Sequence, residues 1–162
     1  MKTENRGFTL IELIVVIAIL GIAAALVGAS LSTVSGAHAK KCAASTDALL
    51  SRCRIGCMSK TGETYLALSV AGGKFTAVYY ENGAQVESFT GDANVAVQYA
   101  VSDGTLTNLG ATTVNIRFKR DSGELVITDG YAAVTALTFT SGRTYTINIV
   151  PATGAHWIGG AA

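Results

Sequence analysis

The sequence Gly7-Phe8-Thr9-Leu10-Ile11-Glu12 begins an apolar run that continues to Leu31. Residues 8–31 carry a single charged side chain, Glu12. A helix of this length spans roughly 36 Å at about 1.5 Å per residue, which exceeds the ~30 Å of a hydrocarbon core. We therefore predict that residues 8–31 form an apolar transmembrane or assembly helix, and that the polar residues 1–7 precede it.

Three interpretations of this segment compete. It is typical of an ordinary secretory signal with small residues near 27–29 as a cleavage site, of a plain single-span anchor, or of a segment cut at its polar/apolar junction and kept as a helix. Glu12 discriminates between them, because a carboxylate at mid-bilayer costs about 2.5–3.5 kcal/mol and usually serves a partner. The first two interpretations supply no partner.

The third interpretation supplies one. A cut between Gly7 and Phe8 gives Phe8 a free α-amine, four residues before Glu12. The amine of one subunit and the carboxylate of another can neutralise each other where water is scarce, provided that the two helices are staggered along their axes. This geometry indicates stacking assembly of many subunits.

Residues 7–22 resemble the class III signal of type IV pilins and pseudopilins. The resemblance implies that a prepilin peptidase removes the leader, residues 1–7, that Phe8 is N-methylated, and that Glu12 is needed for entry into a helical filament. The family often has Pro near the middle of this helix, where this chain has Ala29.

The same resemblance implies the partners and the location. The partners are the prepilin peptidase, other pilin or pseudopilin subunits, an inner-membrane assembly platform, and lipid before assembly. The precursor is expected to cross the cytoplasmic membrane once with its C-terminal head outside, and then to join a cell-surface or periplasmic filament. The flanking charges, two on each side of the apolar run, do not decide the topology.

Residues 32–60 predict an amphipathic continuation of the helix to about Met58, followed by a Gly62 cap. Cys42, Cys53 and Cys57 fall close to one helical face. Three alternatives stay open for them: small buried apolar residues, a Cys53–Cys57 disulfide, or metal or redox chemistry.

Residues 61–162 predict a β-rich globular head, because apolar residues alternate with polar ones between turn signals. Asn82-Gly83 is a strong hairpin signal. The fold class is α+β, a long N-terminal helix packed on an antiparallel sheet or sandwich, as in pilins. The expected strands are 65–70, 75–80, 85–90, 94–101, 113–119, 124–128, 134–140 and 144–150, with a short last strand at 155–158.

Two stretches in the head, residues 114–123 and 145–154, carry a second resemblance, to H-type minor pseudopilins. Each combines hydrophobic alternation with a terminal Gly. That family also has a long helix followed by a β-rich head, so the resemblance favours a minor or pseudopilin subunit. It supplies no catalytic residue.

The remaining residues suggest no enzyme. The net charge of +1 gives no reason to expect nucleic-acid binding, and Arg117, Lys119 and Arg120 are interpreted as a solvated strand face. His38 and His156 stand outside zinc spacings, and nucleophile elbows and P-loops are absent. We expect no cofactor, metal or catalytic residue.

Two functions are therefore compared. The first is a structural subunit, a minor pilin or pseudopilin of a type IV pilus or type II secretion-like filament. The second is a secreted or membrane-tethered β-domain binding protein whose N-terminus is only an export signal.

Overall fold

A computed structural model of the chain describes residues 9–102, 104–127 and 130–159. It is an α+β protein with one long helix followed by antiparallel strands. The chain divides into two compact units, Met1–Val34 and Ser35–Ala162, which are described separately below. Within the described ranges, no helix reaches the combined length and apolarity of a membrane-crossing segment.

Helix α1 runs from Leu10 to Ser59, 50 residues in all. The prediction of one helix continuing to about Met58 is confirmed. At its C-terminal end the Ser59 hydroxyl donates to the Ile55 carbonyl (2.7 Å), and the Lys60 amide donates to the Gly56 carbonyl (3.0 Å). The Lys60 bond satisfies the Gly56 carbonyl, which the end of the helix would otherwise leave unpaired.

The part of α1 in the second unit has a wide buried face. Its buried residues recur at intervals of three and four, as expected of a helix packed on one side. Thr46 is the polar member of this face, and its hydroxyl donates to the Cys42 carbonyl one turn earlier (2.8 Å), so its burial leaves no unpaired group. Apart from Gly36 and Gly56, the buried residues are Ala39, Cys42, Ala43, Thr46, Leu49, Leu50, Cys53 and Cys57.

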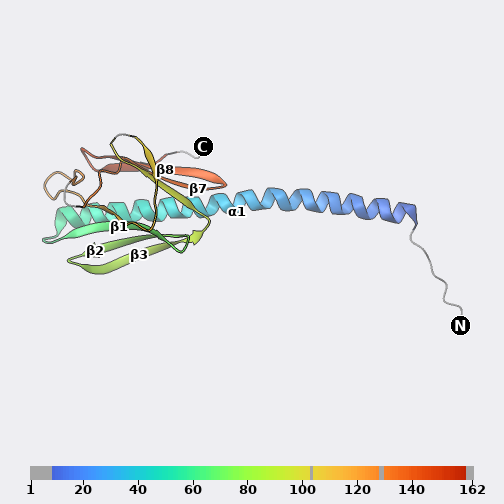
Figure 1. Cartoon of the computed structure of the whole chain (residues 1–162), viewed down its shortest axis with the longest axis horizontal. Coiled ribbons are helices and arrows are strands. Elements are labelled where there is room, and N and C mark those ends of the chain that lie inside the picture. Colours follow the sequence, from blue (N-terminus) through green and yellow to red (C-terminus); the bar gives the residue numbers. More distant parts are fainter. Residues whose placement is uncertain (1–8, 103, 128–129, 160–162) are drawn as a thin grey trace. The chain divides into compact units, whose positions relative to one another are not determined.

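The second unit contains nine described strands in two antiparallel sheets. The first sheet has the order β3-β2-β1-β6 and the second has the order β5-β4-β7-β8-β9. In Figure 1, labelled strands of the two sheets flank the second half of α1. The strands are β1 (Thr64–Ala71), β2 (Lys74–Glu81), β3 (Ala84–Ala93), β4 (Ala96–Ala100), β5 (Leu106–Asn108), β6 (Val114–Ile116), β7 (Ala136–Ser141), β8 (Arg143–Val150) and β9 (Ala155–Ile158).

Tight turns fix the register of the first sheet. Asn82 and Gly83, with φ of 52° and 78°, join β2 to β3, so the predicted Asn-Gly hairpin is confirmed. Gly72 and Gly73 join β1 to β2 with φ of 58° and 73°. Positive φ at both central residues matches the right-handed twist of the flanking strands.

The predicted strand at 124–128 is wrong over the residues that the structure describes. Leu125 forms only an isolated bridge with Phe118, and its amide donates to the Pro151 carbonyl (2.8 Å). The Val126 amide donates instead to the Arg117 carbonyl (2.9 Å). Consecutive amides of this segment therefore donate to two different loops, so no continuous ladder of strand hydrogen bonds forms.

Most strand bounds differ from the prediction by one to three residues, and two differences are larger. The strand expected at 113–119 is limited to Val114–Ile116, and the short strand Leu106–Asn108 was not predicted. All three residues of Leu106–Asn108 are exposed. A strand with no buried face does not need alternating apolar and polar residues, which is the pattern that would have indicated a strand in the sequence.

The core of the second unit joins both sheets and α1. The Phe75 ring of β2 meets the Phe139 ring of β7 edge to face, with centroids 5.3 Å apart. Both side chains are fully buried, as are Leu50 of α1 and Ile147 of β8. Side chains from three layers thus share one continuous apolar cluster.

Candidate functional site

The first turn of α1 is closed by a reciprocal pair of hydrogen bonds between Thr9 and Glu12. The Thr9 amide and hydroxyl both donate to Glu12 Oε2, at 2.9 and 3.1 Å. The Glu12 amide donates to Thr9 Oγ1 at 3.3 Å. This is a capping box, in which residues three apart satisfy the unpaired amides of a helix start.

Sequence reasoning had identified Glu12 as the key acid but had not assigned a role to Thr9. The signal was present, because Thr-x-x-Glu before an apolar run is the pattern of a capping box. Within the described residues, both side-chain hydrogen bonds to this carboxylate end on Oε2.

The helix surface around Glu12 is apolar on every side. Leu10 is 76% exposed and Ile14, one turn later, is 50% exposed. A helix that is hydrophobic all round is stable only when other apolar groups surround it. The exposed large apolar residues of this part are Leu10, Ile11, Leu13, Ile14, Val15, Val16, Ile17, Ile19, Leu20 and Ile22.

The predicted processing residues, Gly7 and Phe8, lie outside the described residues. Of the predicted site residues, the structure therefore places Glu12 alone. It lies within the first turn of α1, exposed, next to the position where the leader would end.

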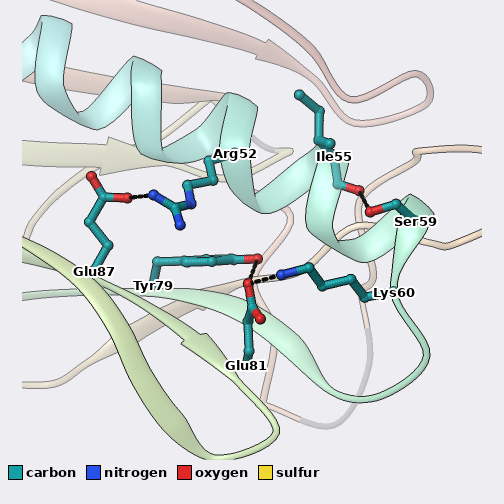
Figure 2. Close-up of polar contacts among 7 residues, drawn as sticks. All are labelled: Arg52, Ile55, Ser59, Lys60, Tyr79, Glu81 and Glu87. Atoms are coloured by element: carbon teal, nitrogen blue, oxygen red, sulfur yellow. Dashed lines mark hydrogen bonds and ion pairs between the residues drawn. The ribbon is translucent and has the colours of Figure 1, made fainter.

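In the second unit, polar contacts attach α1 to the first sheet (Figure 2). The Tyr79 hydroxyl and the Lys60 ammonium both donate to Glu81 Oε1, at 2.7 and 2.5 Å. Arg52 pairs with Glu87 on the neighbouring strand. Together these contacts attach the last two turns of α1 to β2 and β3.

We expect this anchoring to weaken in acid. The Lys60 and Tyr79 donors lower the pKa of Glu81 below its ordinary value of 4.5. A carboxyl whose pKa is lower in the folded state than in the unfolded state stabilises the fold when the pH is above its unfolded-state pKa. This stabilisation is lost as the pH falls through the folded-state pKa. Glu81→Gln should therefore lower the Tm at neutral pH, and the difference from the wild type should shrink below about pH 4.5.

Thermal unfolding of the full chain in detergent across this pH range tests the expectation. Glu87→Gln is the matched control, since it also removes one carboxylate, but from an exposed surface pair that contributes little. A Glu81→Gln deficit that persists unchanged into acid would contradict the role of the Glu81 charge.

The three cysteines are buried and their thiols are free. Cys53 and Cys57 lie one turn apart on α1 with their Sγ atoms 3.9 Å from each other. The Cys57 thiol also donates to the Thr64 carbonyl, at 3.2 Å. Cys42 packs elsewhere, against Gly91 of β3. The predicted common buried face is confirmed.

The two histidines make separate packing contacts. His38 Nδ1 lies 2.6 Å from Asp92 Oδ2 of β3. His156 of β9 accepts a hydrogen bond from Ser51 at Nε2 (2.8 Å), because its Nδ1 faces the Gly154 carbonyl at 3.1 Å and so carries the proton. Each histidine thus connects a strand to α1.

The basic residues singled out in the sequence follow strand β6, and Lys119 and Arg120 are exposed, in agreement with the predicted solvation. Arg117, Lys119 and Arg120 line a cavity of about 340 Å³ together with Lys60 and Cys57. Lys119 also pairs with Glu124 at 2.5 Å. No group of three or more potential metal ligands occurs in the part of the chain that the structure describes.

Residues 2–28 match the family described as the prokaryotic N-terminal methylation motif. No curated protein and no solved structure matched the chain. The matched segment covers Glu12 and the exposed apolar surface around it.

The motif, with its class III signal, supports a likeness to type IV pilin-like chains. It points to a processed structural subunit. It also implies processing by a prepilin peptidase and assembly with other subunits of the same type.

Proposed function

We propose that this chain is a minor pilin or pseudopilin that assembles into a filament through residues 8–31. The observation that carries the proposal is Glu12, a carboxylate set in the first turn of a helix that is apolar on every side. Such a surface needs lipid before assembly and neighbouring helices afterwards. The carboxylate needs a cation in both surroundings.

The cation is the α-amine of Phe8 on an adjacent subunit. Cleavage after Gly7 creates this amine, and N-methylation of Phe8 leaves its positive charge in place. Pairing of the two groups requires neighbouring helices to be displaced along their axes. The pair therefore sets the register of subunits in the filament.

The more specific assignment is an H-type minor pseudopilin of a type II secretion-like filament. A contact in the second unit supports it, since the two stretches with that resemblance pack on each other. A Cβ atom on Gly154, which ends the second stretch, would lie 2.0 Å from the carbonyl oxygen of Gly123, which ends the first. Position 154 therefore has no room for a side chain, which explains why glycine occupies it.

The proposed location follows from the same assignment. The precursor is inserted once in the cytoplasmic membrane, with the unit from Ser35 onward outside the cytoplasm. After cleavage the subunit enters a periplasmic or cell-surface filament. The apolar length of residues 8–31 supports the inserted state.

The N-terminal mass of the purified chain tests the proposal. We expect a mature chain that begins at a methylated Phe8. A chain that begins near Ser30 would instead support an exported β-domain binding protein with an ordinary signal. A chain that retains residues 1–7 would contradict processing altogether. In a strain that lacks the prepilin peptidase, the leader should be retained, which provides the control.

A further inference from the structure

A cavity in the second unit brings a thiol and several cations together. Cys57 lines this cavity of about 340 Å³, which lies beside the C-terminal end of α1. The described residues that line it include no carboxylate. Its cationic residues are Lys60, Arg117, Lys119 and Arg120. Three of them have carboxylate partners outside the lining, namely Glu81 for Lys60, Glu63 for Arg117 and Glu124 for Lys119.

The thiol in the cavity has a second thiol behind it. Cys53 is fully buried, whereas Cys57 is 6% exposed and lines the cavity. Their Sγ atoms are 3.9 Å apart. A reagent that enters the cavity therefore meets Cys57 first, and Cys53 lies behind it within reach of the Cys57 sulfur.

We propose that Cys57 and Cys53 form a redox-active dithiol that reacts with anionic disulfides, with Cys57 as the attacking thiol and Cys53 as the resolving thiol. The cavity cations attract the anionic reagent and stabilise the thiolate that attacks it. Cys57 is itself buried, at 6% exposure, so a reagent reaches it only through the cavity that it lines; nearby cations favour the reactive thiolate form.

The reaction balances with the disulfide as the oxidant. The Cys57 thiolate attacks one sulfur of the disulfide R–S–S–R, the S–S bond breaks, and one R–S⁻ leaves. Cys53 then loses its proton and attacks the Cys57 sulfur of the mixed disulfide, which releases the second R–S⁻. The two protons from the cysteines end on the two released thiolates, so two cysteine thiols are oxidised and one disulfide is reduced.

The position of the pair in the helix permits this closure. Residues one turn apart have Cβ atoms about 5–6 Å apart, and a disulfide requires about 3.8 Å. The last turn must therefore tighten when the bond forms. Because α1 ends at Ser59, two residues after Cys57, the adjustment falls on a helix end and not on its middle.

The electrostatics of the two thiols agree with their assigned order. The hydrogen bond with Cys53, together with Arg117, lowers the pKa of Cys57 below its usual 9.0. The pKa of Cys53 is raised by its hydrogen bond with Cys57 and by burial. Cys57 is therefore the thiol of the pair that ionises first.

The first experiment incubates the reduced full chain, purified in detergent, with oxidised glutathione. We expect two of the three thiols to disappear, with an intact mass lower by two hydrogens and no retained glutathione. Cys42→Ala is the matched control, because Cys42 lies outside the pair; it should oxidise like the wild type and leave no free thiol. Retention of all three thiols in the folded wild type would overturn the proposal.

A second variant traps the intermediate. Cys53→Ala replaces a small buried residue by another and should leave one glutathione covalently bound to Cys57, located by peptide mapping. Cys57→Ala should leave Cys53 unmodified. Modification of Cys53 in the Cys57→Ala variant would show that the assigned order is wrong.

A charge test identifies the class of reagent. Arg120 is exposed, so Arg120→Gln should fold normally while it removes one cation from the cavity. We expect it to slow the reaction with anionic oxidised glutathione about threefold or more, but not the reaction with cationic cystamine. Equal slowing with both reagents would overturn the role of the cavity cations. The outcome does not depend on filament assembly.

Discussion

Glu12→Leu should be cleaved and inserted in the membrane like the wild type, yet be absent from filaments. Leucine matches the apolar surface around it. Membrane insertion should therefore become more favourable, because the variant avoids placing a carboxylate in lipid, which costs about 2.5–3.5 kcal/mol at mid-bilayer. Entry into the filament should fail, because the amine of the neighbouring subunit then has no anionic partner. The amount of the chain in sheared or purified filaments, relative to its amount in membranes, measures the effect.

The capping box requires a control. Glu12 also bonds the Thr9 amide, so Glu12→Leu removes a helix cap as well as a charge. Thr9→Val removes the hydroxyl bonds and keeps the carboxylate, and a cap of this kind contributes only about 1 kcal/mol. We expect Thr9→Val to assemble normally. Normal incorporation of Glu12→Leu, or loss of Thr9→Val from filaments, would contradict the pairing argument.

Gly154→Ala should destabilise the second unit more than any exposed substitution. Gly154 has φ of +65°, where an L side chain is strained. Its new Cβ would also lie 2.0 Å from the Gly123 carbonyl oxygen and 2.9 Å from Phe118 Cδ1. Because a backbone oxygen cannot rotate away, we expect a loss of about 3 kcal/mol, or roughly 10 °C in Tm.

Gly72→Ala separates the two causes. Gly72 has φ of +58°, and a Cβ there meets nothing within 4 Å. This variant should therefore show the cost of backbone strain alone, about 1 kcal/mol. Thermal unfolding followed by circular dichroism compares the two variants. Equal losses would show that the contact between Gly154 and Gly123 is relaxed at no cost.

Much of the fold was predictable because local chemistry determines it. The proline-free stretch before Thr61 and the spacing of its cysteines predicted the helix and its buried face. Asn82-Gly83 predicted a hairpin, because few other dipeptides accept positive φ at both positions. The cost of its charge singled out Glu12 as a candidate assembly residue independently of any contact, and this role stays a prediction.

The failures have physical causes as well. At 124–128 the apolar residues Leu125 and Ile127 have strand spacing, yet Leu125 is buried and Ile127 is 64% exposed. The two apolar residues therefore do not share one buried strand face, although their spacing suggested that they would.

The cavity could not be predicted, because it joins Cys57 at the end of α1 to Arg117–Arg120 some 60 residues later. Only tertiary folding brings these segments together. In the sequence, three basic residues beside a strand are indistinguishable from a solvated face.

Strand β3 forms one edge of the first sheet and is mostly exposed along its length. The unpaired backbone of such an edge can recruit a strand from another molecule and start amyloid-like growth. Glu87 and Asp92 place carboxylates on this strand, and each is held by a basic residue of α1. These two carboxylates place polar, charged groups at the edge where uncontrolled aggregation would begin, in a chain that we propose polymerises by a different route.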